Sequence, residues 1–147
     1  MLTLPNHAAS IIAVLQLTVA TMSACYNYGS SVKNGSKDKK RIMDQLDGLK
    51  KVLEDVGQLV EDWGEATPQL SAMVELLNGR EGFARCRDEL ETLKAKLEPK
   101  SSRLQFAQML AWPLKEGDVR KTLDYLAQFQ RSLGLAMNVD QTYVSFI

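Results

Sequence analysis

Few side chains in this 147-residue sequence have the types and spacing that catalysis needs. The only histidine is His7, so the chain cannot offer two imidazoles to a metal ion or form a histidine pair. His7 could act as a base toward a serine or cysteine nucleophile. A single histidine near the start of a chain is, however, far more often incidental than catalytic, and we expect no catalytic role for it.

Acidic and glycine-rich segments also lack a catalytic pattern. Glu61, Asp62 and Glu65 surround Trp63 at the end of a periodic segment, where carboxylates usually form a solvated helix face. Residues 79–82 (GREG) lack the Lys-Ser/Thr ending with which a P-loop binds phosphate. We therefore predict a protein that is not an enzyme and that uses no cofactor and no metal.

The two cysteines, Cys25 and Cys86, match no metal-binding spacing. Two cysteines do not make a disulfide framework. We expect both to be buried thiols of an intracellular protein, and one structural disulfide between them is the alternative.

Charge is balanced overall but unevenly distributed along the chain. The 18 basic and 18 acidic residues leave no net charge, which argues against a general nucleic-acid-binding protein. Residues 33–51 carry +4, residues 54–91 carry −7 and residues 94–131 carry +4. Such blocks are mostly helix faces that complement one another, and less often a basic patch that binds membranes or partners.

The first 32 residues contain no Asp, Glu, Lys or Arg. Residues 8–26 are mostly apolar and long enough to cross a bilayer, which takes about 20 residues, although they are more polar than a typical membrane span. A secretory signal fits less well, because no Lys or Arg precedes the run and the run exceeds the usual length of roughly 7–15 residues. We expect a helix from Thr3 to about Tyr28. Its apolar residues cover the whole circumference, which indicates a helix that is central in a bundle or lies in lipid.

The strongest periodic pattern lies in residues 37–63. Apolar residues recur there at alternating spacings of four and three, which predicts one face of a long helix: Ile42, Leu46, Leu49, Leu53, Val56, Val60 and Trp63. Gly48 and Gly57 each cost such a helix about 1 kcal/mol relative to Ala. Either glycine would therefore be explained by close packing against a neighbouring helix.

The rest of the chain predicts further helices. Apolar stripes indicate helices from about Gly82 to Glu98 and from about Lys115 to Asp140, with short helices around residues 70–77 and 104–111. Residues 142–147 are β-prone, and we expect them to lie against the bundle or to begin a linker. The predicted fold is a single all-α domain over residues 1–147, an antiparallel bundle of four or five main helices and one or two short ones. The uncharged N-terminal helix and loop occupy residues 1–32, and amphipathic helices occupy residues 33–147.

The order of these features resembles the HeLo-like N-terminal domains of fungal NOD-like receptors (STAND proteins), which are related to HeLo cell-death domains. Such domains begin with an uncharged helix that contains a run like residues 14–18 (VLQLT) and ends in aromatic residues like those at 25–28 (CYNY). The later segments that resemble the family are residues 46–54 (LDGLKKVLE), 86–90 (CRDEL), 112–115 (WPLK) and 133–142 (LGLAMNVDQT). The resemblance covers nearly the whole chain and rests on the order of the segments.

The resemblance implies a helical bundle that executes programmed cell death by forming pores or disrupting membranes. In such systems a NACHT or NB-ARC nucleotide-binding module, or an amyloid-signalling partner, brings copies together, and the first helix then inserts into the plasma membrane. The protein would be cytoplasmic when inactive and at the plasma membrane when activated. No nucleotide-binding module follows before Ile147, so we expect either one domain of a longer protein or a short stand-alone protein. The lack of acidic residues in residues 1–32 disfavours a selective cation channel.

Two groups of residues follow as the expected site. Residues 2–28 would be the membrane-active element, inserting through Leu2, Leu4, Ile11, Ile12, Val14, Leu15, Leu17 and Val19. A basic cluster would bind anionic membrane lipids, each charge contributing about 1 kcal/mol at the surface: Lys33, Lys37, Lys39, Lys40 and Arg41. The partners would be these lipids and further copies of the chain, and no nucleic acid. Two alternatives stay open: a helix that is only part of the core, and an adaptor bundle that docks a partner's bundle without acting on membranes.

Overall fold

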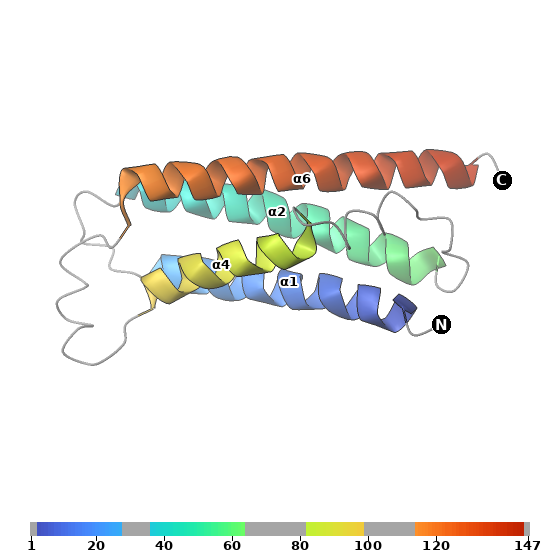
Figure 1. Ribbon diagram of the computed structural model, residues 1–147, viewed down its shortest axis with the longest axis horizontal. Helices are drawn as coiled ribbons and strands as arrows, with labels where there is room; N and C mark the ends of the chain where they lie inside the picture. The colour runs from blue at the N-terminus through green and yellow to red at the C-terminus, as the bar shows by residue number, and fades with distance from the viewer. Residues whose placement is uncertain (1–2, 28–35, 64–81, 99–113, 146–147) are drawn as a thin grey trace.

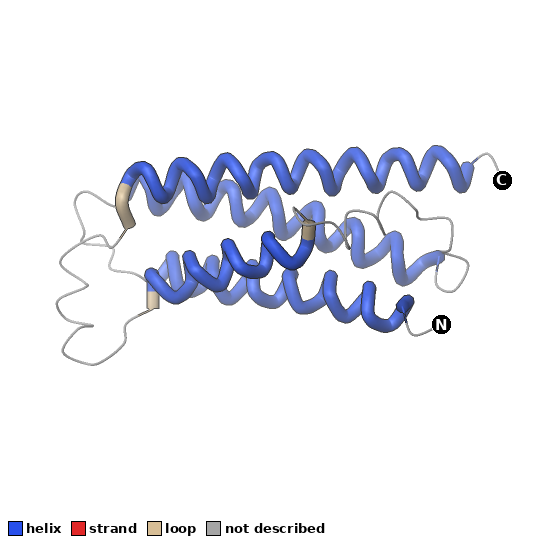
Figure 2. Tube along the Cα trace, in the orientation of Figure 1, coloured by secondary structure: helices blue, strands red, loops and turns tan. Residues whose placement is uncertain are grey.

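The computed structural model describes residues 3–27, 36–63, 82–98 and 114–145, with side chains described for residues 9–27, 37–59, 82–98 and 114–139. Four helices make up these ranges: α1 (Thr3–Asn27), α2 (Ser36–Trp63), α4 (Phe83–Leu97) and α6 (Glu116–Ser145) (Figure 1). Within these ranges the structure contains no strand (Figure 2). The all-α prediction is therefore confirmed. The short helices expected around residues 70–77 and 104–111 lie outside the described residues.

The described helices alternate in direction along the chain (Figure 1). α1 packs against α2 and α4, α2 also packs against α6, and α4 meets α6 more sparingly. The thiol of Cys25 near the end of α1 lies 3.9 Å from the carbonyl oxygen of Lys39 near the start of α2, so these helices are antiparallel. Lys96 Nζ lies 3.7 Å from Asp118 Oδ2, which places the end of α4 beside the start of α6. Neighbours that are not consecutive, α1 with α4 and α2 with α6, run in the same direction.

α2 contributes one continuous stripe to the core. Its fully buried side chains are those that the spacing predicts: Ile42, Leu46, Leu49, Leu53 and Val56. Leu59 is buried as well, whereas the side chains of Val60 and Trp63 lie outside the described residues. Because burying each such side chain contributes about 1.5–3 kcal/mol, this stripe is a principal source of the bundle's stability.

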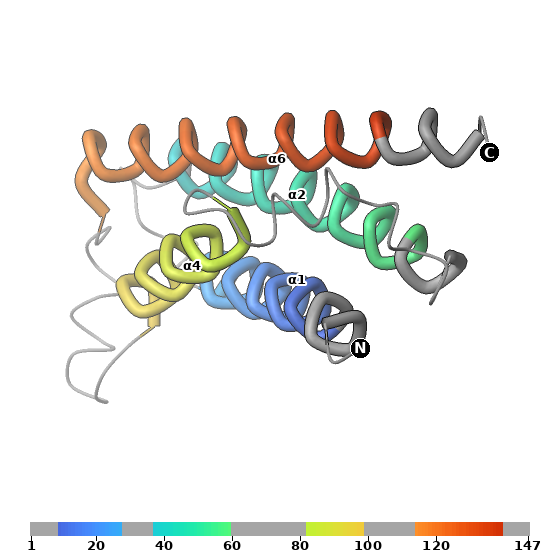
Figure 3. The backbone as a smooth tube through the Cα atoms, turned by 45° about the vertical axis from the view of Figure 1, so that its right-hand side comes forward, coloured from blue at the N-terminus to red at the C-terminus, as the bar shows by residue number. Residues whose placement is uncertain are grey.

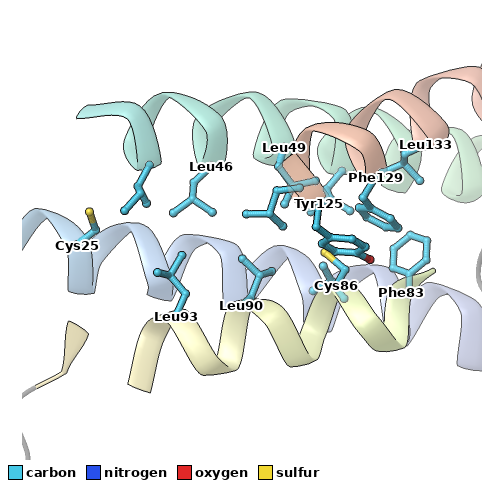
Figure 4. Close-up of a cluster of buried hydrophobic side chains, with 14 of the residues drawn as sticks. Cys25, Leu46, Leu49, Phe83, Cys86, Leu90, Leu93, Tyr125, Phe129 and Leu133 are labelled. Atoms are coloured by element: carbon cyan, nitrogen blue, oxygen red, sulfur yellow. The ribbon is translucent and has the colours of Figure 1, made fainter. Parts of the chain in front are cut away.

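Aromatic rings join α4 to α6 in the core (Figure 4). The rings of Phe83 and Phe129 meet edge to face at 5.3 Å between centroids, and Tyr125 stacks on Phe129 at 6.1 Å. The Tyr125 hydroxyl donates to the carbonyl oxygen of Gly82 at 3.2 Å, so this buried polar group is paired. The guanidinium of Arg85 lies over the Tyr125 ring, 4.3 Å from its centroid.

The C-terminal prediction was wrong in one respect. The sequence predicts that the last helix ends at about Asp140, before the β-prone residues 142–147. In the structure α6 continues to Ser145. Extending an existing helix adds a hydrogen bond for each residue that is fixed, and the lower helix propensity of Thr, Tyr and Val costs only about 0.7 kcal/mol or less per residue. No Gly or Pro follows Gly134 to stop the helix.

Candidate functional site

The segment Ala9–Asn27 of α1 is the one described helix that is long and apolar enough to cross a membrane. A core helix of a soluble protein and a signal sequence share this length and composition, so its burial is more informative. Just 28 % of its most apolar window is buried inside the molecule. α1 is thus not enclosed on all sides, and its buried share is similar to that of α2. It lies at one edge of the bundle, against α2 and α4 (Figures 1 and 3).

The buried face of α1 combines apolar side chains with two threonines. The buried residues are Ile11, Val14, Thr18, Thr21 and Cys25, spaced by three and four. Ile12 and Val19, by contrast, are 52 % and 41 % exposed, and Tyr26 is also exposed. Two threonines therefore face the bundle beside Ile11 and Val14, while Ile12 and Val19 face outward among small and polar residues such as Gln16.

The buried threonines find their hydrogen-bond partners inside α1. Thr18 Oγ1 donates to the carbonyl oxygen of Val14 at 2.7 Å, and Thr21 Oγ1 donates to that of Leu17 at 2.7 Å. A threonine hydroxyl bonded one turn back needs no partner from another helix. The two buried threonine hydroxyls are consequently paired without help from α2 or α4.

The residues predicted to insert into lipid do not share one face. Ile11 and Val14 are buried in the bundle, Ile12 and Val19 lie on the outer face, and Leu15 and Leu17 are half-buried between them. The side chains of Leu2 and Leu4 lie outside the described residues. Periodicity could not have separated these groups, because apolar residues surround the helix.

The basic cluster lies at the start of α2, beside the end of α1. Lys37, Lys40 and Arg41 are exposed, and Arg41 forms an ion pair with Asp38 at 3.5 Å. Lys39 differs from them, since it is half-buried and its ammonium donates to the carbonyl oxygen of Tyr26 at 2.8 Å. Lys33 lies outside the described residues. The sequence placed these charges in one cluster but could not distinguish the role of Lys39.

A shallow hollow of ≈ 290 Å³ lies where α1 and α2 meet. It is lined by Val19, Met22, Ser23, Tyr26, Asn27, Met43 and Lys50. No local pattern predicts this hollow, because its walls come from two helices whose pairing is set by packing. Its apolar side chains extend the outward-facing apolar surface of α1 onto α2.

Both cysteines are buried free thiols, so the alternative of a disulfide between them is not realised (Figure 4). Burial raises the pKa of the Cys25 thiol from 9.0 to about 11, although the charge of Lys39 acts in the opposite direction. Burial raises the pKa of the Cys86 thiol to about 12, and the nearby Glu89 carboxylate adds to the effect. Such thiols are protonated and unreactive at neutral pH. Among the described residues, no three His, Cys, Asp or Glu side chains gather where they could hold a metal ion.

Comparison with models of protein families, with curated proteins and with solved structures finds no match to this chain. What α1 and the basic cluster do is therefore inferred from this chain's own residues.

Proposed function

We propose that this chain is a non-enzymatic cell-death execution domain that forms pores in membranes or disrupts them. In this proposal copies assemble, α1 leaves the bundle, and α1 inserts into the plasma membrane while the basic cluster binds anionic lipid. The assembly signal would come from a NACHT or NB-ARC module or from an amyloid-signalling partner, as the resemblance to HeLo-like domains implies. The observation that carries the proposal is α1 itself, a membrane-length helix without Asp, Glu, Lys or Arg whose Ile12 and Val19 side chains are exposed.

The hydrogen bonds of α1 support such a transfer. A polar group moved into hydrocarbon without a partner costs several kcal/mol. The hydroxyls of Thr18 and Thr21 keep their carbonyl partners wherever the helix goes, because those partners belong to α1. The buried face of α1 can therefore change from protein to lipid surroundings without losing these two bonds.

Release of α1 has a cost, and that cost supports a need for assembly. α1 covers apolar faces of α2 and α4. Once uncovered, these faces would present side chains such as Leu46 and Leu90 to water. Contact between copies would cover them again, so self-association and membrane insertion would favour each other.

Dye release from vesicles tests the proposal. Vesicles of phosphatidylcholine and phosphatidylserine would be mixed with the protein, whose copies are brought together by a fused, chemically induced oligomerisation tag. Val19→Glu places a charge on the exposed face of α1, and Val139→Glu places the same charge on α6, where the valine is 57 % exposed. We expect the wild type and Val139→Glu to release dye and Val19→Glu to lose most of the release, because a carboxylate at the centre of an inserted helix costs about 2.5–3.5 kcal/mol.

Circular dichroism and thermal unfolding must show that both variants keep the wild-type fold. Equal dye release by the wild type and Val19→Glu would reject insertion through α1. Intact vesicles with assembled wild-type protein would reject membrane disruption altogether.

A specific observation favours a second candidate, an adaptor bundle. Leu135 and Val139 are large, exposed apolar side chains one turn apart on α6, away from α1. Such a pair suits contact with an apolar stripe of another helix. An adaptor predicts no dye release by any variant, and association between copies that Val139→Glu weakens and Val19→Glu does not. Sedimentation velocity of the three proteins measures that association.

A further inference from the structure

We propose that Lys39 is a latch that holds the end of α1 on α2, and that opening of this latch is the first step in the release of α1. The latch is defined by Lys39, Tyr26 and Cys25. The role of the latch in releasing α1 rests on the proposed function. The contact of Lys39 with the end of α1 can be tested without a membrane.

The latch has two contacts on one ammonium group. Lys39 Nζ donates to the carbonyl oxygen of Tyr26 at 2.8 Å and lies 5.4 Å from the centroid of the Tyr26 ring. The last carbonyl groups of a helix have no partner within the helix, and they carry its partial negative charge. α1 has no basic residue in its own last turn. Lys39 supplies from α2 the cation that the end of α1 lacks.

Cys25 lies beneath the latch. It is fully buried, and its thiol lies 3.9 Å from the backbone carbonyl oxygen of the same Lys39. Separation of the end of α1 from the start of α2 would therefore uncover this thiol. Cys86 lies elsewhere in the core, with Leu90 and Phe83 on α4 (Figure 4). The chain thus contains a probe for opening of the latch and a second probe for opening of the rest of the bundle.

The same contact links storage of α1 to binding of lipid. While the latch is closed, the ammonium of Lys39 is held at the end of α1 by a hydrogen bond at the surface. When it opens, that charge joins Lys37 and Lys40, which are exposed already. Release of α1 would thus free the ammonium of Lys39 from Tyr26 at the moment when the basic cluster has to hold anionic lipid.

Alkylation of the two thiols in the full chain tests the latch. The protein is incubated with N-ethylmaleimide without lipid, and peptide mass spectrometry follows Cys25 and Cys86 separately. Lys39→Met removes the ammonium and keeps the aliphatic part of the side chain. Lys40→Met, one residue away and exposed, is the matched control. We expect Lys39→Met to speed the labelling of Cys25 about tenfold, the factor expected when a hydrogen bond to a charged group is lost. Cys86 should keep its wild-type rate, and Lys40→Met should change neither rate.

Two results would overturn the latch. One is an unchanged rate at Cys25 in Lys39→Met, and the other is an equal acceleration at both cysteines, which indicates a general loss of stability. Lys39→Arg, which restores a cationic donor, should return the Cys25 rate toward that of the wild type. The outcome is separate from that of the proposed function: intact vesicles with assembled wild-type protein would reject membrane disruption, while selective acceleration at Cys25 would still support the latch.

Discussion

Gln45 of α2 donates a hydrogen bond to Gln130 of α6, with 2.7 Å between Gln45 Nε2 and Gln130 Oε1. Gly48 lies one turn further along α2 against the same amide, and a Cβ added there would be 3.0 Å from Gln130 Nε2. Among the described atoms, a Cβ at Gly57 would meet Ile11 Cγ2 at an ordinary 3.8 Å. Of the two glycines that could mark close packing, Gly48 is therefore the one that does.

The close contact at Gly48 predicts that alanine substitutions at Gly134 and Gly48 will have different effects on the free energy of unfolding. Gly134→Ala should raise the free energy of unfolding by about 1 kcal/mol, because Ala is the better helix former and an added Cβ meets no described atom within 4 Å. Gly48→Ala should gain clearly less or lose stability, since the Gln130 amide has to shift. Urea unfolding measures both, and an equal gain at the two positions would contradict the close contact.

A leucine pair tests the described core. Leu90→Ala should lower the free energy of unfolding by about 2–5 kcal/mol, because the side chain is fully buried and its loss leaves a cavity. Leu135→Ala, on the exposed face of α6, should change it by about 0.5 kcal/mol or less. Urea unfolding at neutral pH checks both values. Similar losses for the two variants would mean that Leu135 is covered.

The buried Cys86 thiol predicts a loss of stability in alkali. Its pKa is about 12 in the folded protein and 9.0 ordinarily, so above pH 9 the thiol ionises in the unfolded chain but not in the folded one. Stability from this group is fully present below pH 9 and falls by about 1.4 kcal/mol per pH unit as the pH rises toward 12.

Cys86→Ala removes the thiol and with it this pH-dependent contribution to the free energy of unfolding. Between pH 8 and pH 10, the stability difference between the wild type and Cys86→Ala should narrow by about 1.4 kcal/mol. Urea unfolding under a phosphine reductant at several pH values measures the change. Parallel pH curves for the two proteins would show that the Cys86 thiol ionises alike in both states.

The exposed lysines of the basic cluster predict a salt-dependent affinity for anionic vesicles. The double substitution Lys37→Gln and Lys40→Gln should weaken binding to phosphatidylserine-containing vesicles about 30-fold, from about 1 kcal/mol for each charge. Added salt should reduce the difference, because these charges are screened. Vesicle sedimentation measures binding. Equal affinity of the wild type and the double variant would remove the cluster from the proposed membrane contact.

The positions of the helices followed from local features of the sequence. The stripe from Ile42 to Val56 lies on one face of any α-helix, whatever its neighbours are, and it is buried as its spacing predicts. Pro99 limits α4, which ends at Leu97 as expected. The end of α6 was missed because the β preference of residues 142–145 is weaker than the tendency of a long helix to continue.

The sequence by itself determined where the four described helices lie and that the first of them is uncharged, since periodicity and chain breakers act within one segment. Only the tertiary structure decided which face of α1 is buried. Apolar residues surround that helix, so packing against α2 and α4 selected a face with Thr18 and Thr21 and left Ile12 and Val19 outside. Likewise, the contact of Lys39 with Tyr26 exists only once α1 and α2 lie antiparallel, because no local pattern pairs an ammonium with a helix end 13 residues away.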